Sequence, residues 1–185
     1  SGLIGWYDFS DISKLWKDVA LTSPVTADND AVLGVTDKSP GVNPLTDAVG
    51  ATYKTNIQNG RSVVRCNGTT QSLANSEPAR ATQTMFWVGR QTSAPSAPQR
   101  PILSMTNQSG GCALTTTSAT SATNWLFHND AAAAMVNLGT TSTAYHVMTF
   151  KVVSAASLII RADGTQVASF DPPNSVTTDV AWDIG

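Results

Sequence analysis

The sequence has few of the residues on which hydrolytic and metal-dependent chemistry depends. Among 185 residues there are one glutamate, two histidines and two cysteines, and 13% of the residues are charged. Glycosidases need two carboxylates about 5–10 Å apart, one of them kept protonated, and Glu77 has no acidic residue two or four positions away. Neither His128 nor His146 lies near a Gly-x-Ser-x-Gly elbow. We therefore expect a protein that is not an enzyme.

Long apolar runs and basic clusters are also missing. No stretch approaches the roughly 20 apolar residues of a membrane-spanning helix, and the first residues do not form the basic-then-apolar pattern of a signal peptide. The net charge is -2 and the basic residues are scattered singly, whereas nucleic-acid-binding proteins carry a basic patch. Neither a membrane span nor a nucleic-acid partner is expected.

The two cysteines, Cys66 and Cys112, are too few to indicate a disulfide framework. They either pair with each other or remain as two buried thiols. Cys66 ends the strand-like run Val63, Val64, Arg65, where a thiol behaves as a small hydrophobe. This position favours the buried thiols.

The clearest pattern is YHVMTFKVVSAASLIIRADGTQVASF, at 145–170. Met148, Phe150 and Val152 alternate with more polar positions, which is the period of a strand with one buried face. The pattern predicts three strands, at 145–153, 157–162 and 165–170. Asp163-Gly164 predicts a tight two-residue turn between the last two. A hairpin cannot bury its apolar face alone, so an opposing sheet is required.

Other short strands are expected throughout the chain, at 3–8, 31–36, 61–67, 82–90, 102–106, 112–117, 123–128, 133–138 and 179–185. The run at 82–90 is nearly continuously apolar, as in a central strand. Ser10 is expected to cap a helical turn that carries Ile12, Leu15 and Trp16, and the Pro and Gly residues of 38–50 exclude regular structure there. About a dozen short strands at this spacing favour a sandwich or barrel.

Two parts of the chain resemble one family. The run GLIGWYDFSDISKLW, followed by PVTADNDAV, DKS and YKTNIQNGRSVVRCNG, together with the hairpin YHVMTFKVVSAASLIIRADGTQV, resembles the concanavalin A-like (laminin-G-like) jelly-roll domains of bacteriophage virion proteins and bacterial surface proteins. The resemblance implies an all-β, antiparallel two-sheet jelly-roll sandwich in a single domain, 1–185. Cys66 stands where the family usually has Phe, which supports the buried thiol. Family members continue past the final Ile-Gly with another strand, so that strand is expected to be absent after Gly185 or supplied by another chain.

The resemblance implies a non-enzymatic protein of the phage particle surface, as a tail, fibre or capsid-decorating component. Its expected partners are other virion proteins, cell-surface glycans held by the sandwich, and further copies of itself. Two alternatives remain. The first is a carbohydrate-active enzyme or the accessory carbohydrate-binding module of one. The second is a purely structural assembly adaptor.

Two groups of residues are candidates for binding. Seven aspartates precede residue 50, against three lysines, and Asp28, Asn29 and Asp30 place adjacent oxygens that suit calcium; calcium sites are common in the resembled family. The alternative is that such residues cap turns. No other cofactor is expected, because no phosphate loop or zinc-ligand spacing occurs.

Aromatic side chains are the usual platforms for sugar rings, and this chain offers Trp6, Tyr7, Trp16, Trp87, Trp125 and Trp182. Trp87 is expected in the core, and Trp6 and Trp16 are expected to pack under the N-terminal segment. Trp125 is the platform to test first, although a core role is the alternative. Polar residues flank it in the sequence: Asn124, His128, Asn129 and Asp130. His146 is expected on the core face, bonded to backbone.

Overall fold

The structure, a computed structural model, describes residues 2–41, 43–67, 70–75, 83–90, 100–105, 112–116, 124–129, 134–140, 144–154, 157–170 and 182–184. The protein is all-β: strands make up most of the described residues, which confirms the predicted class. The described part contains one helical turn, the 3-10 helix η1 (Ile12–Lys14), and no helix long and apolar enough to cross a membrane.

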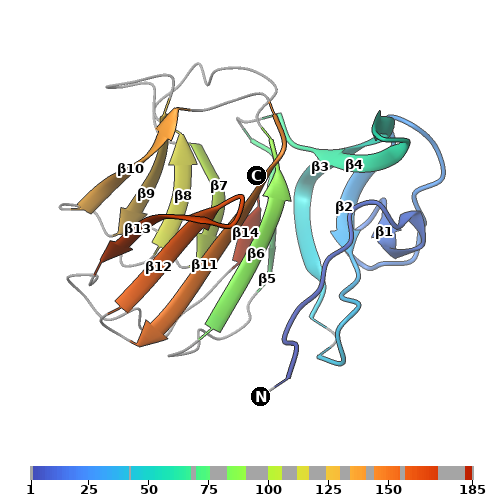
Figure 1. Cartoon of the computed structure of the whole chain (residues 1–185). Helices are drawn as coiled ribbons and strands as arrows, with labels where there is room; N and C mark the ends of the chain where they lie inside the picture. Colours follow the sequence, from blue (N-terminus) through green and yellow to red (C-terminus); the bar gives the residue numbers. More distant parts are fainter. Residues whose placement is uncertain are drawn as a thin grey trace. The chain divides into compact units, whose positions relative to one another are not determined.

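The chain forms two compact units, and the second is inserted in the sequence of the first (Figure 1). The first unit comprises Ser1–Glu77 and Trp182–Gly185, and the second comprises Pro78–Ala181. The single domain over 1–185 stays a prediction.

The first unit is built on one antiparallel sheet. Its strands are β1 (Leu15–Trp16), β2 (Ala31–Val35), β3 (Leu45–Gln58), β4 (Arg61–Arg65), β5 (Leu73–Asn75) and β14 (Trp182–Ile184). They are ordered β1-β2-β3-β5-β14, and β4 also pairs with β3. Thr46 of β3 pairs with Gly34 of β2 and with Ala74 of β5. The final strand predicted at 179–185 is β14, which places Asp183 opposite Ala74.

The core of the first unit is formed by apolar side chains from four of these strands and from the loop before β2. Its buried members are Leu15, Val25, Val32, Val35, Leu45, Ala51, Tyr53 and Leu73. Cys66 is partly buried and packs against this cluster, as expected of a small hydrophobe. The side chain of Cys112 lies outside the described residues.

Strand β3 bends at residues 47–50, where its register with β2 shifts between Val32 and Gly34. Gly50 adopts a φ of 63°, and a Cβ atom there would lie 2.4 Å from the carbonyl oxygen of Val32. The carboxylate Oδ1 of Asp47 accepts hydrogen bonds from the backbone N–H groups of the bend, including that of Gly50 at 3.3 Å. Glycine is required here because both the backbone conformation and the space exclude a side chain.

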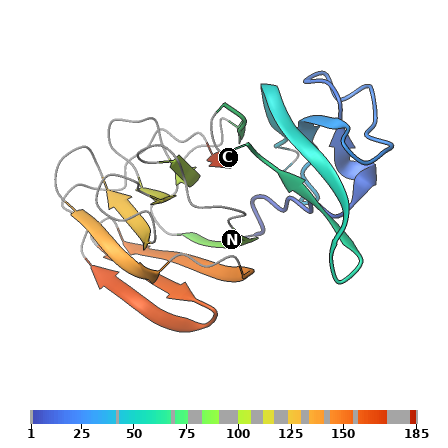
Figure 2. The same cartoon turned by 90° about the horizontal axis from the view of Figure 1, so that it is seen from above.

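The second unit contains two sets of antiparallel strands. One set is β6 (Gln83–Gly89), β11 (His146–Ser154), β12 (Ser157–Ala162) and β13 (Thr165–Phe170), ordered β13-β12-β11-β6. The other is β7 (Arg100–Met105), β8 (Cys112–Thr116), β9 (Asn124–Asn129) and β10 (Ala134–Thr140), paired in sequence order. Figures 1 and 2 show the two sets as two layers, in agreement with a sandwich.

The predicted hairpin at 145–170 is confirmed as β11, β12 and β13. Phe150 pairs with Ile160 on one side and with Met85 of β6 on the other, and all three side chains are buried. Asp163 and Gly164 adopt φ values of 50° and 82°, so both turn residues are left-handed, as a type I′ turn requires. The pair Asn59 and Gly60 makes the same kind of turn between β3 and β4, with φ values of 50° and 74°.

Four expectations about local structure are wrong. The segment 3–8 is not a strand, and the helical turn η1 is capped by Asp11 instead of Ser10, with Leu15 and Trp16 in β1. Regular structure begins at Leu45, inside the stretch 38–50, because Pro40, Gly41 and Pro44 all precede it. The apolar run at 82–90 is β6, which stands at the end of the sheet order and not in its centre. The run is continuously apolar because both the buried face and the exposed face of β6 carry apolar side chains.

Candidate functional site

The predicted sugar platform, apart from Asp130, lies on β9. Strand β9 pairs with β8 and β10, with position 125 opposite Thr116 and position 128 opposite Ala113 and Met135. Alternate positions of a strand belong to opposite faces of the sheet. Positions 125 and 129 therefore alternate with 124 and 128, and Asp130 lies outside the described residues. Binding by Trp125, Asn124, His128, Asn129 and Asp130 stays a prediction.

The residues predicted to bind calcium accept hydrogen bonds from the protein. Oδ1 of Asp28 accepts from the backbone N–H of Thr55 at 2.8 Å, and Oδ1 of Asn29 accepts from the ammonium of Lys54. Oδ2 of Asp30 accepts from the backbone N–H groups of Thr26 and Ala27 at 2.8 and 3.0 Å. Asp30 caps its own turn, whereas Asp28 and Asn29 join the turn to residues of β3.

The pKa values of Asp28 and Asp30 lie below their usual range because backbone N–H groups, from Thr55 and Thr26 respectively, bond the ionised forms. In the described part of the chain no three His, Cys, Asp or Glu side chains gather in a way that could hold a metal ion.

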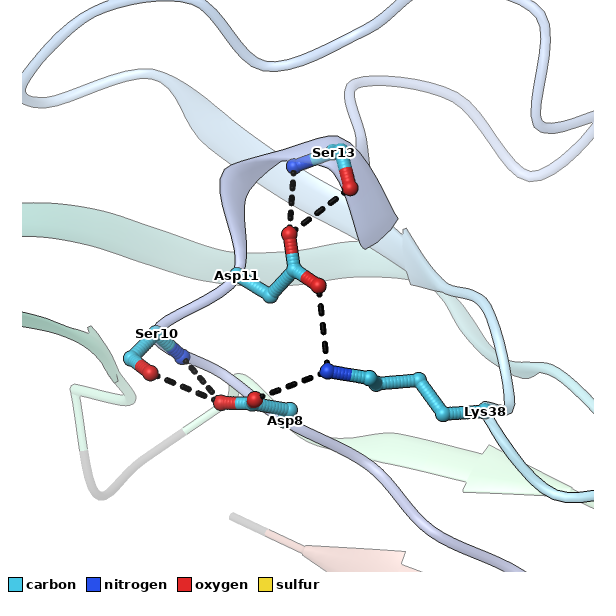
Figure 3. A network of polar contacts seen from close by, with 5 residues as sticks. All are labelled: Asp8, Ser10, Asp11, Ser13 and Lys38. Carbon is cyan, nitrogen blue, oxygen red and sulfur yellow. Dashed lines mark hydrogen bonds and ion pairs between the residues drawn. The ribbon is translucent and has the colours of Figure 1, made fainter.

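A polar network joins the N-terminal segment to the loop between β2 and β3 (Figure 3). The ammonium Nζ of Lys38 lies 3.1 Å from Oδ2 of Asp8 and 3.1 Å from Oδ2 of Asp11. The other carboxylate oxygens accept from the hydroxyls of Ser10 and Ser13, each at 2.7 Å. The cation is thus held between two carboxylates that are themselves fixed by serines.

These contacts favour the charged forms of all three titratable groups. Hydrogen bonds from Ser10 and Lys38 lower the pKa of Asp8, and those from Ser13 and Lys38 lower the pKa of Asp11. Hydrogen bonds to Asp8 and then Asp11 raise the pKa of Lys38.

Trp6 lies beside this network and is exposed, contrary to the expectation that it packs beneath the N-terminal segment. Half of its surface, 50%, is accessible, and Nζ of Lys38 lies 4.8 Å from its ring centroid. The backbone of Trp6 is held on both sides: its C=O accepts from the N–H of Lys38, and its N–H donates to Asp37. An exposed indole beside carboxylates is an arrangement that can hold a sugar ring.

The other aromatic residues have structural roles where they are described. Trp16 is partly buried, and its Nε1–H donates to Oγ1 of Thr36 at 2.6 Å. The hydroxyl of Tyr7 donates to the backbone C=O of Asn43 at 2.7 Å. Trp87 is partly buried on the face of β6 that carries Met85.

The buried side chain of Asp37 holds the loop between β2 and β3 through hydrogen bonds from backbone N–H groups. It is 6% exposed, and its carboxylate accepts from the backbone N–H groups of Trp6, Ser39 and Asn43 and from the Ser39 hydroxyl. Burial opposes ionisation of Asp37, but the hydrogen bonds from Ser39, Trp6 and Asn43 outweigh it and hold its pKa below the usual value. The role of Asp37 is to position the loop.

An exposed apolar surface lies on the second unit. Phe86 and Val88 of β6 are 69% and 65% exposed, and Val147 of β11 is 42% exposed. The strand register places Val147 opposite Val88 and Thr149 opposite Phe86, so the three apolar residues adjoin one another. We call this surface the outer face; its described positions are Thr84, Phe86, Val88, Val147, Thr149, Lys151, Ile159 and Arg161.

Sequence reasoning missed the outer face because MFWV, at 85–88, contains no polar residue to mark an exposed side. The exposure of Phe86 follows from tertiary packing, which covers Met85 and leaves the alternate positions open. No signal in the sequence separates these two faces.

No protein-family model matches the chain, and a search of curated proteins finds no match either.

Proposed function

We propose that the chain is a non-enzymatic binding component of a bacteriophage particle surface, a concanavalin A-like jelly-roll sandwich that holds a partner protein of the particle on the outer face. The observation that carries the proposal is the exposure of Phe86, Val88 and Val147 side by side. Folded proteins keep few contiguous apolar patches in water, and such patches commonly mark interaction sites. The shortage of catalytic residues in the sequence supports a non-enzymatic role, and the resemblance of the two quoted segments supports the particle surface.

Site-specific crosslinking tests this proposal. The chain carries the photoreactive residue benzoylphenylalanine in place of Phe86 during particle assembly, and a control chain carries it in place of Val19, which is 52% exposed in the first unit. We expect light to join position 86, and not position 19, to one structural protein of the purified particle. Purified particles in which position 86 forms no crosslink would overturn the proposal.

A second candidate function, glycan binding, is supported by Trp6. Its half-exposed ring, with Asp8 and Asp11 nearby, offers stacking together with hydrogen-bond acceptors. A glycan array with and without calcium tests it. The matched variants are Trp6→Ala and Ile12→Ala, a 37% exposed residue of the same segment. We expect glycan binding that is lost in Trp6→Ala and retained in Ile12→Ala. If no glycan on the array binds, only the protein-binding function remains.

An activity assay separates the alternative of a carbohydrate-active enzyme from the proposed binding function. We expect no polysaccharide to be cleaved by the purified chain. Turnover that survives Glu77→Gln would show a catalytic site of another kind.

A further inference from the structure

We propose that the edge of β6 that no described strand occupies accepts an extended segment of the partner, in which outward side chains run apolar, apolar, acidic. This inference rests on the proposed function and deepens it, because it names the strand that holds the partner and the chemistry that the partner presents.

The edge of β6 is long and regular. Among the described strands β6 pairs with β11 alone, and the register runs over seven consecutive pairs, from His146 opposite Gly89 to Val152 opposite Gln83, without a shift. The second edge of such a strand presents N–H and C=O groups that are a template for another strand. Recognition by strand addition uses these groups for affinity and alternate side chains for specificity.

The opposite edge of the same sheet is different. Strand β13 pairs with β12 through a shift between Ile160 and Arg161, and such bulges are one way in which proteins discourage pairing at an edge. Strand β6 carries no bulge, no proline and no charged residue within Gln83–Gly89. Of the two edges, β6 is the one suited to accept a strand.

The side chains beside the edge specify the partner. A strand added to β6 places successive outward side chains beside Val88, Phe86 and Thr84, and the first two positions favour apolar contacts. Thr84 is opposite Lys151, which is exposed. A lysine side chain is long enough to reach across a threonine toward a carboxylate on the added strand.

The charge of the outer face supports an acidic partner. Arg161 of β12 stands opposite Thr149 and adds a second cation to that of Lys151. None of the eight described positions of this face carries a carboxylate, and the carboxylate of Asp163, which accepts from the N–H of Val147, lies at the start of β11, four residues before Lys151. The charge around Lys151 therefore complements an acidic residue. Every pairing in the sheet of β6 is antiparallel, and antiparallel pairing is slightly the more stable, which sets the order apolar, apolar, acidic from the partner's N-terminus.

The probe is a capped heptapeptide with the sequence Thr-Val-Thr-Val-Thr-Glu-Thr, labelled for fluorescence anisotropy and titrated with the whole chain. We expect saturable binding that weakens about tenfold when lysine replaces the glutamate. The variant Lys151→Glu should reverse that preference, and Phe86→Thr should weaken binding by a similar factor. Val167→Thr, an exposed position of β13, is the matched control and should leave binding unchanged.

Methylation of peptide nitrogens distinguishes edge pairing from apolar adhesion. Alternate amides of a strand point to opposite sides, so methylating one alternate set blocks pairing with β6 and methylating the other set does not. We expect one methylated peptide to lose binding and the other to retain it. Equal binding by both would overturn the strand-addition inference.

Two further results separate this inference from the function on which it rests. If the heptapeptide fails to bind while position 86 still crosslinks to a particle protein, the inference is wrong and the proposed function stands; if neither occurs, both are wrong. Sedimentation velocity tests whether a second copy of this chain occupies the edge of β6 instead. A dimer that Phe86→Thr converts to a monomer would show this, and would overturn the inference.

Discussion

Oδ2 of Asp163 lies 2.7 Å from Nδ1 of His146, a contact that ties the turn between β12 and β13 to the first residue of β11. Oδ1 of the same carboxylate accepts from the backbone N–H of Val147 at 2.9 Å, and the N–H of Asp163 donates to the C=O of Val147. An ionised carboxylate only accepts hydrogen bonds, so Nδ1 of His146 carries the hydrogen. The Val147 N–H bond and the His146 contact hold the pKa of Asp163 below its usual value.

Replacing Asp163 tests how much its hydrogen bonds to His146 and Val147 stabilise the fold. Asp163→Ala removes all side-chain acceptors and places alanine at a φ of 50°, a conformation that asparagine and aspartate tolerate better. We expect Asp163→Ala to lower the thermal midpoint measured by circular dichroism, and Asp163→Asn to lower it less, because asparagine keeps an acceptor and suits the turn. Equal midpoints for the two variants would contradict a stabilising role for the hydrogen bonds of the Asp163 side chain.

The two left-handed glycines should respond differently to alanine. At Gly164 a Cβ atom meets nothing within 4 Å, so Gly164→Ala costs only the backbone strain of positive φ, about 1–2 kcal/mol. At Gly50 the clash with the Val32 carbonyl adds to that strain, and we expect a cost of about 2–5 kcal/mol. Urea unfolding measures both, with Gly2→Ala, which faces open space, as the control.

Asp37 should make the first unit sensitive to acid. Its pKa is lowered in the folded state, so its contribution to stability is present above the unfolded value of about 3.9 and is lost as pH falls through the lower folded value. We expect Asp37→Asn to flatten the loss of unfolding free energy between about pH 5 and pH 3 relative to the native chain.

At neutral pH, Asp37→Ala leaves the backbone donors of Trp6, Ser39 and Asn43 without the acceptor that they use. We expect this variant to cost about 2–4 kcal/mol in urea unfolding. A neutral effect would show that water replaces the carboxylate.

Phe150 and Phe86 form a matched pair for separating stability from binding. Phe150 is 2% exposed and Phe86 is 69% exposed, so Phe150→Ala should cost about 3–5 kcal/mol, whereas Phe86→Thr should change the free energy of unfolding by less than about 0.5 kcal/mol. A large loss in Phe86→Thr would mean that Phe86 packs within the fold, against its assignment to the outer face.

Prediction from sequence succeeded where local pattern decides structure. The strands of the 145–170 hairpin and the turn at Asp163-Gly164 were predicted, because alternation and turn chemistry act between near neighbours. The long strand β3 was not predicted at all, since its bend depends on Asp47 and Gly50 and its formation depends on pairing with β2. The candidate residues at 124–130 and 28–30 were chosen by proximity in sequence, and alternation along β9 and hydrogen bonds to distant backbone cannot be seen at that level.

By itself the sequence determined the β class, the hairpin turns and the shortage of catalytic groups, because these follow from each residue's own polarity, backbone preference and chemistry. Only the tertiary structure decided that β6 stands at an edge of the described strands, that Phe86 and Val88 are exposed while Met85 is covered, and that Asp37 is buried while Trp6 faces water. The physical reason is that burial and strand order are set by contacts between segments far apart in the chain, which no local pattern records.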